Sequence, residues 1–209
     1  MTLSRQSLRT DRRSLLLAGS AFALAGVSPA AAAPVVRADD MVLGDPKAKV
    51  TVVEYASASC PHCAHFANED FPQFKKAYID TGKVRFVLRE LLTPPQNFAA
   101  LGFLTARCAG RDKYFDVLAA VFRDQAEIYR TSDLRGGLLK IAQGAGLTEE
   151  KLNACINQDA LTAMQTRINA DAQADDIDQS PTFFVNGVKL GGSVDFAALK
   201  AAVDKALKG

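Results

Sequence analysis

Two cysteines separated by two residues, Cys60 and Cys63, are the residues of this sequence best suited to chemistry. They follow a valine-rich, β-type run and stand where a helix is expected to begin, with Pro61 at its first position. Residues three apart lie on one face of a helix, so the two sulfurs can come close enough to form a disulfide. The motif therefore predicts a redox-active dithiol between a strand and a helix.

The position of Cys60 predicts a depressed thiol pKa. The first turn of a helix has unpaired backbone N–H groups and the positive end of the helix dipole, both of which stabilise a thiolate. His62, between the two cysteines, can add positive charge when it is protonated. A pair stabilised in its reduced form is a stronger oxidant. Cys63, one turn deeper, is expected to be the resolving cysteine.

The same spacing could belong to a metal or haem site. A closed zinc site needs two more ligands, and the candidates are His65, Cys108 and Cys155. A c-type haem needs a histidine directly after the second cysteine, where this chain has Ala64. The strand-to-helix setting favours the redox dithiol, so we expect no bound metal or other cofactor.

The first 33 residues differ from the rest of the chain. They contain four arginines and one aspartate, then a mildly apolar run over residues 14–27 and a row of alanines. This pattern predicts an export signal over residues 1–33, cleaved near residues 31–33. Arg12 and Arg13 resemble the pair of a twin-arginine signal. A general secretory signal and an uncleaved membrane anchor are the alternatives.

The charge of the whole chain is set by that signal. The chain has 25 basic and 23 acidic residues, a net charge of +2. Removing the four arginines and one aspartate of residues 1–33 leaves 21 basic and 22 acidic residues, a net charge of −1. Nucleic-acid binding needs a basic patch on the mature domain, so we do not expect it.

The remaining residues, 34–209, predict one domain of strands and helices. An extended lead-in precedes a strand from Val50, a helix over 64–79, a strand from Val84 and a helical block over about 96–176. A hairpin over 182–190 turns at Asn186-Gly187, and a terminal helix follows. The acidic residues from 171 to 178 are interpreted as a solvated helix end. The order predicts an α/β fold with a mixed central sheet and helices inserted between its two halves.

This order, the Cys60-Pro61-His62-Cys63 motif and the run Ser180-Pro181-Thr182-Phe183-Phe184-Val185-Asn186-Gly187 resemble the DsbA-like thiol:disulfide oxidoreductases. The resemblance covers roughly residues 40–209. It implies a thioredoxin-like fold with an inserted helical block, in which Cys60 is the exposed nucleophile and Cys63 the resolving cysteine. The family more often has Gly and then Val or Thr before the proline, where this chain has Gln179 and Ser180. The chain also has no Trp, which favours an oxidant over a thioredoxin-like reductase.

The resemblance assigns further site residues. Pro181 matches a proline that follows a cis peptide bond and lies across from the redox sulfurs, which leaves the backbone of Ser180 free to pair with a substrate. Ser180 and Pro61 are therefore expected to bind substrate. Glu54 matches a buried acid beneath the active site, with a raised pKa and the capacity to relay the proton of Cys63. Its alternative is a strand residue that faces solvent.

Cys108 and Cys155 lie outside the motif, in the helical block. In an oxidising compartment we expect a structural disulfide between them, which stabilises by about 4 kcal/mol in the chain-entropy model. Two free thiols and a redox relay to the active site are the alternatives.

The expected function is that of a monomeric periplasmic oxidase that donates its Cys60–Cys63 disulfide to newly exported, cysteine-containing proteins. The resemblance implies reoxidation by a quinone-linked membrane partner of the DsbB type. One alternative is a disulfide reductase or isomerase, although the dozen residues between the signal and the first strand are too few for a dimerisation domain. Others are a copper or zinc assembly chaperone and a substrate-binding chaperone with incidental thiols.

Overall fold

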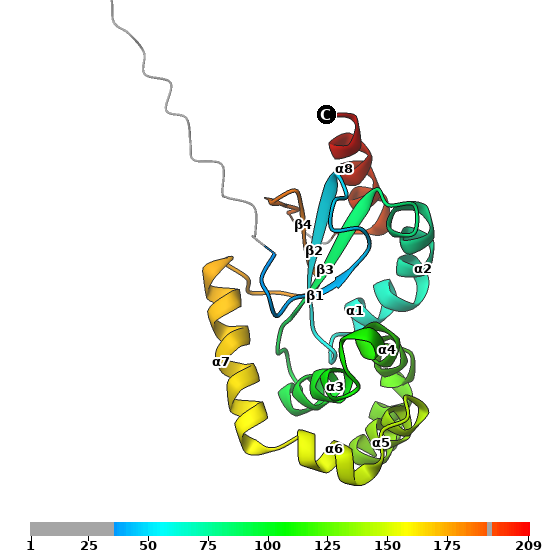
Figure 1. Ribbon diagram of the computed structural model, residues 1–209, viewed down its shortest axis with the longest axis vertical. Helices are drawn as coiled ribbons and strands as arrows, with labels where there is room; N and C mark the ends of the chain where they lie inside the picture. The colour runs from blue at the N-terminus through cyan, green and yellow to red at the C-terminus, as the bar shows by residue number, and fades with distance from the viewer. Residues whose placement is uncertain (1–35, 192–193) are drawn as a thin grey trace, which may run out of the picture. The chain divides into compact units, whose positions relative to one another are not determined.

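The computed structural model describes residues 36–191 and 194–209, so the export signal predicted over residues 1–33 lies outside the described residues. A mixed five-stranded sheet has the order β1-β3-β2-β4-β5 (Figure 1). The strands are β1 (Met41–Leu43), β2 (Val50–Ala56), β3 (Val84–Glu90), β4 (Thr182–Val185) and β5 (Val188–Lys189). β2 and β3 run parallel, and every other pair is antiparallel. The mixed central sheet predicted from the sequence is confirmed.

Both faces of the central strands are covered, which explains their nearly continuous apolar sequence. Adjacent residues of a strand point to opposite faces. On β2, Tyr55 donates a hydrogen bond to the backbone carbonyl of Asp171 on helix α7 (Gln158–Ala174) at 3.3 Å. Glu54 lies on the other face, beside Phe66 and Phe71. The redox motif and the charged end of α7 are therefore on different sides of the sheet.

The helix after the cysteine motif is interrupted, as Pro72 predicts. It begins at Pro61 with α1 (Pro61–His65), continues through a π-helical segment (Phe66–Asp70) into α2 (Phe71–Phe74), and ends in a second π-helical segment (Lys75–Ile79). Pro72 lies in the first turn of α2, where a missing N–H is tolerated. Tyr78, in the last segment, donates a hydrogen bond to Asp204 of the terminal helix α8 (Phe196–Lys208) at 2.7 Å.

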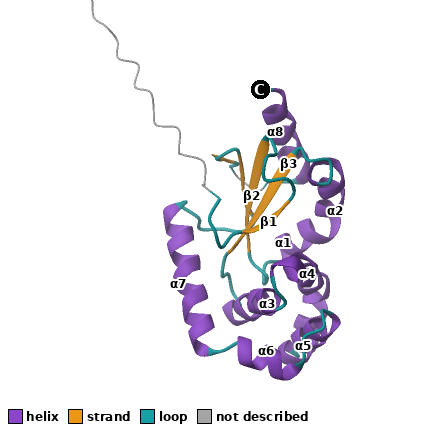
Figure 2. Cartoon of the chain, in the orientation of Figure 1, coloured by secondary structure: helices purple, strands orange, loops and turns teal. Residues whose placement is uncertain are grey.

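The helical block occupies residues 96–174 between β3 and β4 (Figure 2). Its helices are α3 (Gln96–Cys108), α4 (Tyr114–Thr131), α5 (Leu134–Gly144), α6 (Glu149–Cys155) and α7. A disulfide joins Cys108, at the end of α3, to Cys155, at the end of α6, with a Cα–Cα distance of 6.0 Å. Among the described residues, no helix has the length and apolar character needed to cross a membrane.

One strand was not predicted from the sequence, and one predicted hairpin is confirmed. The extended lead-in contains a strand, β1, which pairs antiparallel with β3 from Met41 opposite Leu88. Three residues are too few for a period-two pattern to stand out, so the strand was not predicted. The hairpin between β4 and β5 turns at Asn186 and Gly187, whose φ angles of 46° and 81° suit a type I′ turn.

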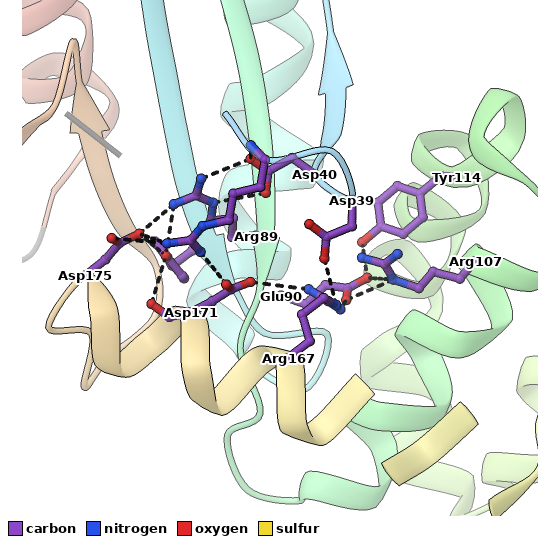
Figure 3. A network of polar contacts seen from close by, with 11 residues as sticks. Asp39, Asp40, Arg89, Glu90, Arg107, Tyr114, Arg167, Asp171 and Asp175 are labelled. Carbon is purple, nitrogen blue, oxygen red and sulfur yellow. Dashed lines mark hydrogen bonds and ion pairs between the residues drawn. The ribbon is translucent and has the colours of Figure 1, made fainter. Parts of the chain in front are cut away.

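A network of charged side chains joins the end of β3 to the helical block (Figure 3). The buried guanidinium of Arg89 donates to both carboxylate oxygens of Asp40 at 3.0 Å and to Asp175 at 2.5 Å. Asp171 pairs with Arg37 from the lead-in. The acidic stretch was predicted to be a solvated helix end. For Asp171 and Asp175 that prediction is wrong, because both carboxylates bind arginines at the sheet.

Glu90, beside Arg89, is the second centre of the network. Its carboxylate accepts hydrogen bonds from Arg107 of α3 at 2.7 and 3.0 Å and from the hydroxyl of Tyr114 at 2.8 Å. Arg167 of α7 pairs with it as well. Three helices of the block are thus bound to one carboxylate of the sheet.

Candidate active site

The two cysteines of the motif are adjacent at the start of α1. Cys60 is the N-cap residue, and its sulfur accepts a hydrogen bond from the backbone N–H of Cys63 at 3.4 Å. The Cys60 thiol also contacts the backbone carbonyl of Ser180 at 3.4 Å. Both cysteines are free thiols, and Cys60 retains 7% of its exposure while Cys63 has none. Cys60 is therefore the sulfur that a partner can reach.

The pKa values of the two thiols are shifted in opposite directions. A hydrogen bond from the Cys63 thiol, together with the side chain of Ser180 and the backbone N–H groups of Cys63 and His62, lowers the pKa of Cys60 from 9.0 to about 5. Burial opposes this shift but is outweighed. Burial raises the pKa of Cys63 well above 9.0, helped by its hydrogen bond to Cys60 and by the charge of Glu54. At neutral pH the reduced pair holds one thiolate, on Cys60.

His62 and Pro61 are exposed in the first turn of α1. His62 contributes to the low pKa of Cys60 through its backbone N–H, which is a consequence of its place at the helix N-terminus.

Glu54 is buried beneath the cysteines, with 4% of its surface exposed, so the alternative in which it faces solvent is wrong. It borders a small cavity of about 40 Å³ whose other lining residues include Phe66, Phe71 and Phe122. No hydrogen bond or ion pair among the described residues engages its carboxyl group. Burial, with the negative charge of Cys60, raises the pKa of Glu54 from 4.5 to about 8.

A groove runs beside Cys60 between α1 and the loop before β4. The peptide bond between Ser180 and Pro181 is cis, and both residues line this cavity of about 530 Å³ together with His62 and His65. Asp70 and Asp195 also lie along it, and none of its lining residues is Lys or Arg.

Sequence reasoning missed two residues of α4 that touch the loop before Cys60. Gln125 is 4% exposed and donates to the backbone carbonyls of Ala58 and Cys60, at 2.7 and 3.3 Å. The hydroxyl of Tyr129 donates to the carbonyl of Ser59 at 2.9 Å. One signal was available, because Gln125 interrupts the apolar stripe of its helix with a polar group.

The metal-site alternative loses two of its candidate ligands. Cys108 and Cys155 are bonded to each other, so neither sulfur can complete a zinc site at the motif. His65 is exposed and lines the groove. Over the residues that the structure describes, no three His, Cys, Asp or Glu side chains gather in a way that could hold a metal ion.

Comparisons with known proteins agree with this fold and site. The family model described as thioredoxin matches residues 37–205. A Rickettsia conorii protein named a protein-disulfide oxidoreductase is 40% identical over 173 residues, which cover 81% of this chain and 61% of that protein. Disulfide bond formation protein D of Bacillus subtilis is 27% identical over 173 residues, which cover 80% of this chain and 77% of that protein. The chain therefore spans about three fifths of the length of its Rickettsia relative.

Solved structures point to the same branch. The crystal structure of α-DsbA1 from Wolbachia pipientis superimposes with a TM-score of 0.74 and 29% sequence identity. The match covers 83% of this chain and 93% of that one. With its mixed sheet, inserted helices and paired cysteines at a helix N-terminus, this chain belongs to the thioredoxin family as a DsbA-like protein.

Proposed function

We propose that this chain is a thiol:disulfide oxidoreductase that oxidises newly exported proteins with a Cys60–Cys63 disulfide. The observation that carries the proposal is the opposite shift of the two thiol pKa values, to about 5 for Cys60 and well above 9.0 for Cys63. A thiolate so stabilised makes the reduced pair the favoured product, and a disulfide whose reduced form is favoured is a strong oxidant.

The reaction follows from which sulfur is accessible. A substrate thiolate attacks the sulfur of Cys60, the Cys60–Cys63 bond breaks, and a mixed disulfide forms between substrate and Cys60. Cys63 leaves as a thiolate and takes up a proton. A second substrate thiolate then attacks the substrate sulfur of the mixed disulfide, and Cys60 leaves as a thiolate. The substrate loses two electrons and gains a disulfide, while the chain gains both electrons as its reduced dithiol.

Glu54 is the proposed source of the proton that Cys63 needs. Its pKa of about 8 keeps the carboxyl protonated at neutral pH. The ionised carboxylate raises the pKa of Cys63, so the two groups interact. The cavity of about 40 Å³ beside Glu54 is otherwise lined by apolar side chains, which favour the protonated form of the carboxyl. Positioned acids of this kind typically contribute about 10²- to 10⁴-fold.

The groove beside Cys60 is the proposed substrate site. In the described residues the backbone N–H of Ser180 has no hydrogen-bond partner, so it is free to pair with an extended substrate strand. The backbone carbonyl of Ser180 lies 3.4 Å from the sulfur of Cys60, and Pro61 follows Cys60 at the first position of α1. Backbone pairing would accept many sequences, as an oxidase of diverse proteins requires.

Export to the periplasm is part of the proposal. It rests on the signal pattern of residues 1–33 and on the Cys108–Cys155 disulfide, since disulfides persist in oxidising compartments. Turnover requires reoxidation of the Cys60–Cys63 dithiol, for which we propose a quinone-linked membrane partner of the DsbB type. We propose that the chain acts as a monomer.

The reduction potential of the Cys60–Cys63 pair tests the direction of the reaction. It is measured by equilibration in glutathione buffers on a Cys108→Ser/Cys155→Ser variant, so that one couple reports. We expect about −120 mV, as for DsbA itself, and oxidation of a reduced dicysteine peptide that is lost in Cys60→Ser. A value near or below about −220 mV would overturn the oxidase in favour of a reductase.

A further inference from the structure

Three successive backbone carbonyls at the nucleophile accept hydrogen bonds from one helix of the inserted block. Gln125 of α4 donates its side-chain amide to the carbonyl of Ala58 at 2.7 Å and to that of Cys60 at 3.3 Å. Tyr129, one turn further along α4, donates its hydroxyl to the carbonyl of Ser59 at 2.9 Å. The three carbonyls form one continuous stretch that ends at the nucleophile.

We propose that Gln125 and Tyr129 are positioning residues of the redox site, through which the inserted block holds the backbone that carries Cys60 in its thiolate-stabilising geometry. The inference goes beyond the proposed function, because it assigns to the helical block a control over the nucleophile. It also rests on that function for its biological use.

The contact made by Gln125 satisfies acceptors that water cannot reach. Ala58 is fully buried and Gln125 is 4% exposed, so a lost donor would leave a buried carbonyl unpaired. The carbonyl of Cys60 already accepts the N–H of Ala64 at 3.0 Å in the first turn of α1. A carbonyl has two lone pairs, and Gln125 occupies the second one.

The contact made by Tyr129 is supported by an aromatic neighbour on α3. Its ring packs on Phe98 of α3 with the ring centroids 4.8 Å apart, which fixes the direction of the hydroxyl. Burial and the nearby charge of Cys60 raise the pKa of Tyr129, so the hydroxyl keeps its proton as the pH rises. The influence of Cys60 on this hydroxyl places Tyr129 within electrostatic reach of the nucleophile.

The thiolate depends on the geometry that these contacts fix. Its stabilising partners are the thiol of Cys63, the side chain of Ser180 and the N–H groups at the start of α1. Hydrogen bonds to sulfur weaken quickly when the donor and acceptor move apart or out of line. If the carbonyls of residues 58–60 lose their anchors on α4, the loop shifts and the sulfur of Cys60 loses part of that stabilisation.

The test measures the pKa of Cys60 by the thiolate absorbance of the reduced protein as a function of pH. Gln125→Leu removes both amide donors at similar volume, and Tyr129→Phe removes only a hydroxyl. We expect Gln125→Leu to raise the pKa of Cys60 by about one unit, and Tyr129→Phe to raise it by less. A tenfold change in the equilibrium corresponds to a potential about 30 mV less oxidising.

Matched controls separate positioning from general stability. Ile128→Ala lowers the melting temperature from a buried position of the same helix, and Tyr114→Phe removes a different buried hydroxyl of α4. Ile128 has no hydrogen-bonding side chain and Tyr114 donates to Glu90, so neither substitution removes a hydrogen bond to residues 58–60 and both should leave the pKa of Cys60 unchanged. If Gln125→Leu and Tyr129→Phe lower the melting temperature but leave the pKa of Cys60 at the wild-type value, the inference is wrong.

The outcome for Tyr129→Phe decides the matter even where Gln125→Leu fails to fold, because the ring and its packing remain. The proposed function can fail separately. If the wild-type potential lies in the reductase range but both variants still raise the pKa of Cys60, the oxidase is rejected and the positioning residues stand.

Discussion

Two buried glutamates on neighbouring strands are held in opposite ways. Glu54 on β2 is 4% exposed and Glu90 on β3 is 1% exposed. Glu90 lies among Arg107, Arg167 and Tyr114, all of which contact its carboxylate. Glu54 borders an apolar cavity, and its pKa is raised to about 8. Burial alone does not determine how a carboxyl group behaves. The neighbouring side chains decide it.

The difference separates structure from chemistry in this fold. The paired carboxylate of Glu90 binds helices of the inserted block to the sheet. An unpaired one keeps its proton at neutral pH and can give it away. The sheet thus places an anchor on one strand and a proton source on the next.

Replacing the unpaired acid should change stability the most, and in a pH-dependent way. The pKa of Glu54 is about 8 in the folded chain and 4.5 in the unfolded one, so between these values the unfolded chain loses a proton that the folded chain keeps. The contribution of Glu54 to wild-type stability therefore falls as the pH rises from about 4.5 and levels off above about 8, while the lowered pKa of Cys60 contributes in the opposite direction over much of the same range. Glu54→Gln should match the wild type at pH 4.5 and exceed it by up to about 4 kcal/mol at pH 9.

Urea unfolding of the reduced proteins across this pH range measures the difference. A constant difference at every pH would contradict a protonated Glu54 in the folded chain.

Replacing the paired acid should have the opposite sign. Glu90→Gln leaves two arginines facing an uncharged amide, and should lower the free energy of unfolding by about 3 kcal/mol at pH 7. The expected loss is at the lower end for buried pairs because Arg107 and Arg167 are each 23% exposed. Urea unfolding checks it. Glu127→Gln is the control, since its pair with Arg130 is exposed to solvent and should contribute little to stability.

A single hydroxyl sharpens the comparison further. Tyr114 is fully buried and donates to Glu90 at 2.8 Å, so Tyr114→Phe should cost about 2 kcal/mol in thermal or urea unfolding. Tyr78→Phe removes a hydroxyl that donates to Asp204, which is 37% exposed. That control should cost less than half as much. Equal losses would mean that the charge of Glu90 adds nothing to its hydrogen bond.

The smallest expected effect concerns the chemistry. Glu54→Gln removes the proposed proton source of Cys63, and should slow reduction of the Cys60–Cys63 disulfide by a cysteine peptide about tenfold at pH 7. This is less than the roughly 10²-fold typical of a positioned acid, because Cys63 can leave as a thiolate before it takes up a proton. Acid quenching and chromatographic separation follow the mixed disulfide. Glu90→Gln, measured where it remains folded, should react at the wild-type rate. A slow Glu90→Gln with an unaffected Glu54→Gln would reverse the assignment.

Much of the fold could be predicted from the sequence, because its signals are local. The strand before Cys60 and the turn at Asn186-Gly187 are each specified within a few residues. The mixed sheet and its inserted helices follow from their order. The edge strand at Met41–Leu43 could not be predicted, since its partner lies in β3, more than 40 residues away.

The site was only partly predictable for the same reason. The spacing of Cys60 and Cys63 identifies them as a redox pair, whereas the sequence could not decide which face of the sheet Glu54 lies on. Its strand is buried on both sides and carries no polar alternation. Gln125 acts on the loop before Cys60 from 65 residues away, and the partners of Arg89 at Asp40 and Asp175 lie 49 and 86 residues away. Contacts that join distant segments leave no periodic trace in a single sequence.

The charge network also bears on how this chain could be re-engineered. The helical block leaves the sheet after Glu90 and returns just past Asp175, and the contact between Arg89 and Asp175 closes that interval at 2.5 Å. Because the two ends of the helical block lie next to each other, the entropy of closing this loop changes little with the number of residues in the block. The block is therefore an insertion whose two ends are fixed at one place on the sheet. A shorter or longer set of helices could be exchanged at this point, provided that it supplies an acid for Arg89, two arginines for Glu90 and a donor for the loop before Cys60.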